Sequence, residues 1–245
     1  VRKGRATRDA LSYRTGDVMG GRYKVTGALG RGGFGAVYAG EHTGTRQPVA
    51  LKVLALDAET AGDDVVRRFF QEAQVTARLR SPNTVRLFDV GQDDAGPLFL
   101  AMELLDGPTL HQVLRELAAE DQVLTEAQAL DVAVAVLRSL HEAHANGLVH
   151  RDLKPANIIL ATSEEDELLV KVLDFGIART HDSSLTGSGR ALGTPTYMSP
   201  EQCEGHTLDG RSDLYALGVL LWQCVCGKPP FVHDSPLGLM YQHRH

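Results

Sequence analysis

Four polar residues in the second half of the chain have the side-chain types that phosphoryl transfer requires. Asp152, Lys154 and Asn157 stand together in the string His-Arg-Asp-Leu-Lys-Pro-Ala-Asn, and Asp174 follows in Asp-Phe-Gly. Transfer from Mg-ATP to a hydroxyl needs a carboxylate to orient the hydroxyl, oxygen ligands for the metal and a cation near the phosphate. We predict that Asp152 orients the acceptor, Lys154 offsets phosphate charge, and Asn157 and Asp174 bind Mg²⁺.

A glycine-rich string at residues 30 to 37 reads Gly-Arg-Gly-Gly-Phe-Gly-Ala-Val. Glycines allow backbone N–H groups to approach a phosphate without side-chain collision. A Rossmann fingerprint has nearly the same pattern but opens a helix, whereas this string runs into the strand-like residues 36 to 39. No Gly-Lys-Ser/Thr follows, which excludes a Walker A loop. The pattern favours a hairpin that lies over phosphate groups.

Taken together, these strings resemble the catalytic core of the eukaryotic-type protein kinases. The glycine string, Val-Ala-Leu-Lys at residues 49–52, the string at 150–157 and Asp-Phe-Gly at 174–176 occur in the family's order. Asp-Leu-Lys-Pro-x-Asn is the serine/threonine form, and residues 198–202 are similar to the bacterial membrane-sensor branch. The resemblance implies transfer of the ATP γ-phosphate to Ser or Thr hydroxyls of proteins, with Mg²⁺ or Mn²⁺.

The implied fold is α+β and bilobal, as in protein kinases: a small antiparallel β lobe with one helix, and a larger, mainly helical lobe that is incomplete at its C-terminus. The implied catalytic roles extend the set above. Lys52 would bind the α- and β-phosphates and pair with Glu72, and Thr194 would contact the catalytic aspartate and lysine. The complete catalytic set implied is Asp152, Lys154, Asn157, Lys52, Glu72 and Thr194.

The resemblance also implies the nucleotide contacts. The adenine would lie between Val37 and Ala50 on one side and Ile159 on the other, with Met102 at the back of its pocket. Backbone groups of the two residues 103 and 105 would hydrogen-bond the base. The full set is Leu29, Gly30, Gly32, Gly33, Gly35, Val37, Ala50, Lys52, Met102, Glu103, Leu105, Ile159 and Asp174.

Arg151, beside the catalytic aspartate, suggests a switch. A partly buried arginine without an anionic partner is costly, and a phosphate on the segment between Asp174 and Glu201 would pair with it. By resemblance we favour Thr186 and Ser188 as the phosphorylated residues, modified by another copy of the enzyme, which implies self-association.

Hydrophobic periodicity and turn residues predict the elements. Strands are expected at residues 22–26, 36–39, 48–54, 84–89 and 98–103, and helices at 63–80, 110–117, 124–145 and 213–226. A hairpin is expected at 158–160 and 170–173. Residues 1–16 are expected to be a basic flexible leader, residues 17–105 the nucleotide-binding lobe and residues 106–245 the catalytic lobe.

Composition limits the remaining classes. The chain has 245 residues, 43% of them hydrophobic, and a net charge of −6, which gives no reason to expect nucleic-acid binding. The three cysteines lack C-x-x-C spacing, and no apolar run reaches the ~18 residues of a membrane span. We expect a cytoplasmic protein, or the cytoplasmic part of a membrane-anchored one, with protein substrates.

Two alternatives stay open: a nucleotide-binding pseudokinase that acts as a scaffold, and a small-molecule phosphotransferase. Pseudokinases typically lose the lysine or one of the two aspartates, all of which are present here. His141 and His144 suggest a metal site, but a zincin needs an i, i+4 pair, so a plain helix face is expected. Asp213 matches the family's buried aspartate that braces the catalytic loop.

Overall fold

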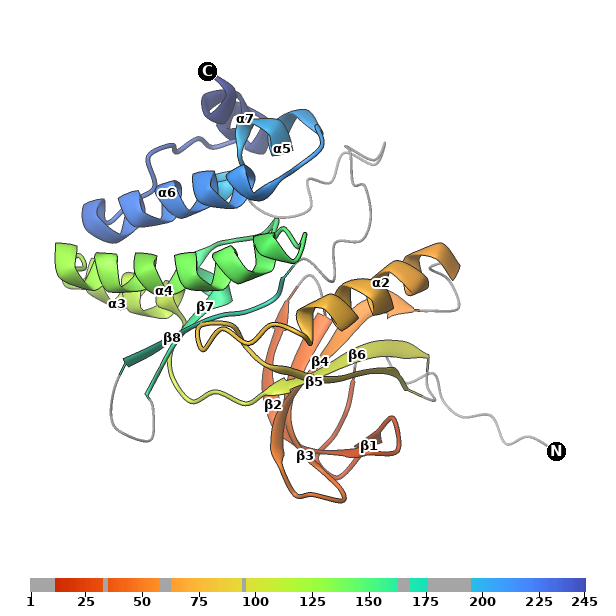
Figure 1. The fold of residues 1–245 in the computed structure, drawn as a ribbon. Coiled ribbons are helices and arrows are strands. Elements are labelled where there is room, and N and C mark those ends of the chain that lie inside the picture. Colours follow the sequence, from red (N-terminus) through yellow and green to blue (C-terminus); the bar gives the residue numbers. More distant parts are fainter. Residues whose placement is uncertain (1–11, 33–34, 58–62, 94–95, 163–167, 176–194) are drawn as a thin grey trace. The chain divides into compact units, whose positions relative to one another are not determined.

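The computed structural model describes residues 12–32, 35–57, 63–93, 96–162, 168–175 and 195–245 (Figure 1). These residues form two compact units. The first joins the residues up to 77 with residues 86–105, and the second joins residues 78–85 with residues 106–245.

The first unit contains a six-stranded antiparallel sheet (Figure 1). Its strands are β1 (Val18–Met19), β2 (Tyr23–Gly32), β3 (Gly35–His42), β4 (Pro48–Asp57), β5 (Leu87–Gln92) and β6 (Pro97–Glu103). The spatial order is β1-β2-β3-β4-β6-β5, so the last strand in sequence lies between β4 and β5. Five strands were predicted, and the sixth is the two-residue β1, which pairs with the start of β2.

The two faces of the sheet differ in composition. On β4, Val49, Leu51 and Val53 belong to the hydrophobic core. Because successive residues of a strand point to opposite faces, Ala50 and Lys52 point to the other face. The buried core cluster is Met19, Tyr23, Val25, Ala36, Tyr38, Val49, Leu51, Val53, Phe99 and Ala101. One strand therefore supplies both the core and a second face with different chemistry.

The helix of the first unit, α2 (Asp63–Thr76), ends before the predicted Arg80. The reason is a competing acceptor. The backbone N–H of Arg80 donates to both carboxylate oxygens of Glu142 at 2.7 and 2.9 Å, and that of Ser81 donates to the same carboxylate at 2.6 Å. These N–H groups are therefore not used to extend the helix.

The strand predicted from residue 84 begins later, at Leu87. The residues before it belong to the second unit and bond within it: Val85 N–H donates to the carbonyl of Val172 at 3.0 Å, and Val172 N–H donates to the carbonyl of Asn83 at 2.8 Å. Sequence alone suggested β propensity here, but it could not show which strand would accept the pairing.

Residues 12–16, which fall within the predicted basic flexible leader, lie against the sheet. The Tyr13 hydroxyl donates to Asp93 at 2.7 Å, the Tyr13 N–H donates to the Tyr38 hydroxyl at 3.2 Å, and the two rings pack edge to face at 5.7 Å. Gly16 N–H donates to the carbonyl of Val25 at 2.8 Å. Residues 1–11 lie outside the described residues.

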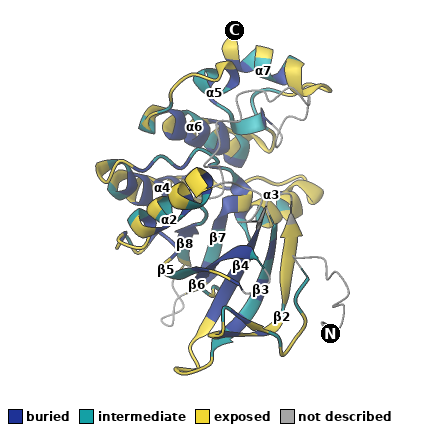
Figure 2. Ribbon diagram, turned by 90° about the vertical axis from the view of Figure 1, so that its right-hand side faces the viewer, coloured by how far each residue is buried: buried dark blue, intermediate teal, exposed yellow. Residues whose placement is uncertain are grey.

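The second unit is mainly helical, as Figures 1 and 2 show. Its helices are α3 (Leu110–Ala119), α4 (Glu126–Ala145), α5 (Pro200–Glu204), α6 (Gly210–Cys226) and α7 (Pro236–Arg244). Thr125 caps α4: its side chain accepts from Gln128 N–H, and the Gln128 side chain accepts in return from Thr125 N–H. Helix α6 starts earlier than predicted because Asp209 caps it by accepting from Arg211 N–H.

A two-stranded hairpin completes this unit. Strand β7 (Ile158–Thr162) pairs with β8 (Leu168–Val172), in a register that sets Ile158 opposite Val172. Two single turns of 3₁₀ helix lie at Pro155–Asn157 and Pro195–Tyr197. The first turn leads directly into β7, so it joins the predicted catalytic string to the hairpin.

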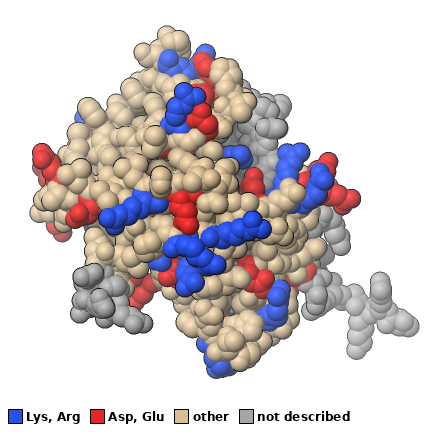
Figure 3. Space-filling model, viewed as in Figure 1, with Lys and Arg blue, Asp and Glu red and all other residues tan. Residues whose placement is uncertain are grey.

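The surface shown in Figure 3 carries interspersed acidic and basic side chains, so that face has no broad patch of one sign. Within the described part of the chain, no helix is long and apolar enough to span a membrane. Cys203, Cys224 and Cys226 are free thiols.

The attachment of residues 12–16 predicts that Tyr13→Phe lowers the free energy of unfolding by about 1–2 kcal/mol, because Asp93 is buried and loses a donor. Urea denaturation measures the change. Tyr241→Phe, at a ring that is 62% exposed, is the control and should leave stability unchanged. Equal effects of the two substitutions would show that the Tyr13 hydroxyl contributes nothing.

Candidate active site

The catalytic string forms a compact network around Asp152. The Lys154 ammonium donates to Asp152 Oδ2 at 2.8 Å. The Asn157 amide nitrogen donates to the Asp152 carbonyl at 2.8 Å and to Oδ2 at 3.3 Å. The carboxylate is thus held by a cation and an amide while its side chain keeps 19% exposure. This arrangement leaves a fixed, negatively charged acceptor that can still meet a substrate.

His150 supports this network through the backbone of Asp152 and Leu173. It is fully buried, and its Nε2 lies 2.7 Å from the carbonyl of Leu173, while its Nδ1 accepts from Asp152 N–H at 3.3 Å. A carbonyl can only accept and a backbone N–H can only donate, so the ring must be neutral with its hydrogen on Nε2. Its ring packs against Phe175, at 4.9 Å between centroids.

The backbone before Asp152 adopts an unfavourable conformation that Asp213 stabilises. Arg151 has a φ of +64°, in the left-handed region that non-glycine residues seldom occupy. The buried Asp213 carboxylate accepts from Arg151 N–H at 2.9 Å and from His150 N–H at 2.8 Å. The Gln202 side chain donates to the Arg151 carbonyl at 2.9 Å. The brace expected of Asp213 is therefore present as two hydrogen bonds from the backbone.

The β7–β8 hairpin brings the two predicted metal ligands, Asn157 and Asp174, to the same end of the hairpin. Leu173 N–H donates to the carbonyl of Asn157 at 2.8 Å, and Asp174 is the next residue. Because the Asn157 amide nitrogen is used by Asp152, its oxygen is the atom left to face a hard cation. Among the described residues no group of three or more His, Cys, Asp or Glu side chains suits a metal ion.

A pocket of about 350 Å³ adjoins the network. It is lined by residues 151–156 of the catalytic string, residues 196–198 after the second 3₁₀ turn, Gln202, two residues of α6, and His111 of α3. Tyr197, on its wall, donates its hydroxyl to Gln223, and burial raises the pKa of Tyr197 to about 12. The Tyr197 hydroxyl therefore serves as a hydrogen-bond donor in the wall of the pocket.

In the first unit, the glycine-rich string forms a hairpin, not the strand-to-helix turn of a Rossmann fingerprint. Gly30 lies opposite Val37, and Gly32 lies opposite Gly35, across β2 and β3. Gly35 has a φ of +137°, and a Cβ there would lie 1.9 Å from the carbonyl oxygen of Val53. Only glycine fits this position.

The predicted phosphate-binding lysine lies beside predicted adenine contacts on one face of this sheet. Lys52 pairs with Val37 on β3, and Ala50 pairs with Met102 on β6. Directly paired residues in an antiparallel sheet point to the same side, opposite the core described above. Lys52 is only 9% exposed, and a buried ammonium requires an anionic partner. Glu72 lies on α2 of the same unit.

The remaining predicted residues are distributed as follows. Leu29 lies on β2 and is 55% exposed. Glu103 ends β6, and its N–H donates to the carbonyl of Arg86 at 2.9 Å; Leu105 follows shortly after. Ile159 lies on β7 of the second unit. Outside the described residues lie Gly33, Thr194, Thr186 and Ser188.

Sequence reasoning missed the role of His144. It was assigned to a plain helix face, but its Nε2 lies 2.8 Å from Asp213 Oδ2, so it is a third partner of the bracing carboxylate. A Cβ on Gly210 would collide with the His144 ring at 2.5 Å, which explains the glycine at the start of α6. No sequence signal could have shown this contact, because the two partners are 69 positions apart.

Comparison with known proteins agrees with this geometry. The protein kinase domain family matches residues 23–245, so the chain belongs to that family. Two relatives are named as serine/threonine-protein kinases: pkn3 of Myxococcus xanthus, 41% identical over 97% of this chain and 43% of its own length, and PknB of Mycobacterium leprae, 38% identical over 91% of this chain and 35% of its own. The chain thus spans less than half the length of these relatives.

Comparison of the fold with solved structures points to the same family. The crystal structure of the Mycobacterium tuberculosis PknI kinase domain superimposes with a TM-score of 0.73 at 33% identity, covering 92% of this chain and 81% of that one. The predicted protein kinase fold, with a β-sheet unit and a helical unit, is confirmed.

The Asp213 brace predicts that Asp213→Asn lowers the free energy of unfolding by about 2–4 kcal/mol, because an amide replaces an acceptor of three donors. Asp131→Asn, at an exposed position of α4, is the matched control and should cost less than about 0.5 kcal/mol. Urea denaturation gives both values, and hydrogen exchange should accelerate at the amides of His150 and Arg151 only in the first variant. Unchanged exchange there would rule out the brace.

Proposed function

We propose that this chain is a serine/threonine protein kinase domain that transfers the γ-phosphoryl group of ATP to Ser or Thr hydroxyls of proteins. The observation that carries the proposal is the Asp152 carboxylate, held by Lys154 at 2.8 Å and by Asn157 at 3.3 Å in the wall of a pocket. The family membership and the names of the relatives support the same reaction.

In this reaction the acceptor hydroxyl donates its hydrogen to Asp152, which orients the oxygen toward the γ-phosphorus. A bond forms between the hydroxyl oxygen and phosphorus, the bond from phosphorus to the β,γ-bridging oxygen breaks, and ADP leaves. Lys154 offsets the negative charge of the transferring group. The geometry fits these roles because Lys154 and the acceptor would share one carboxylate.

The nucleotide would use the first unit's second face. Lys52 binds the α- and β-phosphates and pairs with Glu72, while Val37, Ala50 and Met102 contact the adenine. Asn157 and Asp174 would hold Mg²⁺, which would neutralise phosphate charge as a Lewis acid. Their oxygen donors suit magnesium or manganese and do not suit a softer metal.

The scaffold alternative has less support. Pseudokinases typically lose one of three residues, and Lys52, Asp152 and Asp174 are all present. A small-molecule phosphotransferase is disfavoured by the Thr-Pro-Thr-Tyr-Met-Ser-Pro-Glu segment at residues 194–201, which resembles the acceptor-seating segment of protein kinases. We further propose transfer between copies of the chain onto Thr186 or Ser188, and a cytoplasmic location that fits the free thiols and the need for ATP.

Asp152→Asn tests the catalytic assignment. Transfer from γ-labelled Mg-ATP to a generic protein should fall by about 10²–10⁴-fold, the usual contribution of a general base. Asp131→Asn is again the matched control and should keep wild-type transfer. Acid hydrolysis of the wild-type product should yield labelled serine or threonine. Label on tyrosine, or full transfer by Asp152→Asn, would refute the assignment.

Lys52→Met tests the nucleotide face. We expect transfer to fall by at least about 10²-fold, as for loss of a positioned charge at a phosphoryl group. Lys24→Met, at an exposed lysine of strand β2 in the same sheet, should change transfer less than about twofold. Thermal unfolding with and without Mg-ATP separates binding from folding: a stable Lys52→Met protein that transfers phosphate normally would exclude the proposed role.

A further inference from the structure

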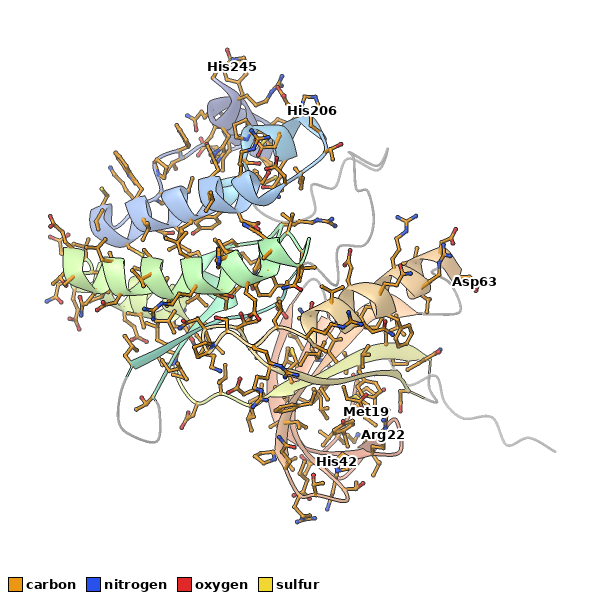
Figure 4. The ribbon with its side chains drawn as sticks, in the orientation of Figure 1. Met19, Arg22, His42, Asp63, His206 and His245 are labelled. Carbon is orange, nitrogen blue, oxygen red and sulfur yellow. The ribbon has the colours of Figure 1, made fainter. Side chains whose placement is uncertain are left out.

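Residues 12–19 form a strap along β2 that lies before the family match, which begins at residue 23. Three backbone hydrogen bonds or pairings attach it: Gly16 N–H donates to the Val25 carbonyl at 2.8 Å, Val25 N–H donates to the Asp17 carbonyl at 2.9 Å, and Val18 pairs with Lys24. Figure 4 labels Met19 and Arg22, which mark where the strap enters the sheet. The strap is therefore an addition to the part of the fold that the family defines.

The far end of the strap contacts the glycine-rich hairpin. The Arg31 guanidinium donates through Nη2 to the Ser12 hydroxyl at 2.8 Å. Arg31 stands between Gly30 and Gly32 in the sequence and is solvent-exposed. A neutral hydroxyl is a weak partner for a guanidinium, whose planar fork matches phosphate and carboxylate groups best. This contact would become far stronger if Ser12 carried a phosphate.

Ser12 is held in place by its neighbour. Tyr13 is anchored at both ends, by its N–H to the Tyr38 hydroxyl and by its own hydroxyl to Asp93. Burial, followed by the hydrogen bond to Asp93, raises the pKa of Tyr13, so the phenol stays a donor. A phosphate on the adjacent residue would meet Arg31 without the entropic cost of ordering the segment. The nearest charged groups of the strap are Arg14, which is exposed, and Asp17, which accepts from Arg14 N–H.

We propose that Ser12 is a phosphorylation site of this chain and that its phosphate forms an ion pair with Arg31, linking the strap to the glycine-rich hairpin. The inference rests on the proposed kinase activity, since another copy would supply the γ-phosphoryl group. The Ser12 oxygen bonds to phosphorus, the bond to the β,γ-bridging oxygen breaks, the hydroxyl proton passes to Asp152 of the acting copy, and ADP leaves. The site differs from Thr186 and Ser188 because its recognising arginine belongs to the phosphate-binding hairpin and not to the catalytic string.

The first experiment locates the phosphate. Asp152→Asn protein, which serves only as substrate, is incubated with catalytic amounts of wild-type protein and Mg-ATP, and the modified residues are mapped by mass spectrometry. Phosphate at Ser12, reaching a substantial fraction of the protein and missing without wild-type enzyme, is the expected result. If wild-type protein labels a generic substrate but leaves Ser12 unmodified, the inference fails and the kinase function stands. If nothing is labelled, the proposed function fails and the inference with it.

The second experiment measures the ion pair without relying on catalysis. Phosphoserine is incorporated at position 12 during synthesis in the Asp152→Asn background, and its second ionisation is followed by phosphorus NMR against pH. Pairing with Arg31 favours the dianion and should lower this pKa by roughly half a unit from its usual value of about 6. Arg31→Gln should restore the usual value, while Arg14→Gln, the matched control on the strap, should restore much less. Equal responses to the two substitutions would refute the specific pair with Arg31.

Discussion

The buried carboxylate of Asp213 accepts hydrogen bonds from the backbone N–H groups of His150 and Arg151 and from the His144 ring, and the geometry of the catalytic loop depends on it. The left-handed conformation of Arg151 is intrinsically unfavourable. It persists because three donors that converge on one carboxylate over-determine the local backbone. Asp152 is the next residue, so the same hydrogen bonds also position its carboxylate.

A second set of bonds fixes the other side of the same loop. The neutral His150 ring bridges the loop to Leu173, and Leu173 N–H continues the β7–β8 ladder to Asn157. The two predicted metal ligands therefore flank the hairpin: Asn157 directly precedes β7, and Asp174 follows β8. The Glu142 carboxylate on α4 acts in a comparable way, because it accepts from the backbone N–H groups of residues 80 and 81, which lie beyond the end of α2. Both cases use a buried or half-buried acceptor to hold backbone that regular structure does not satisfy.

The first unit separates packing from chemistry by the simple alternation of a strand. Leu51 belongs to the core, while its neighbours Ala50 and Lys52 face the opposite side with Val37 and Met102. The same unit holds the strap of residues 12–19, whose one aromatic side chain, Tyr13, packs on that core. Tyr13 thus attaches the strap to the core, and the neighbouring Ser12 connects the strap to Arg31 of the glycine-rich hairpin.

The sequence by itself determined the family, the order of its motifs and most elements, because glycine strings, capping residues and hydrophobic periods act over a few residues. The length of α4 followed from such local signals. Only the tertiary structure decided that α2 ends early, that residues 12–16 lie on the sheet, and that His144 binds Asp213. Each of these depends on a partner more than 60 positions away. A contact between distant segments is set by how the whole chain packs, and local residue propensities do not predict it.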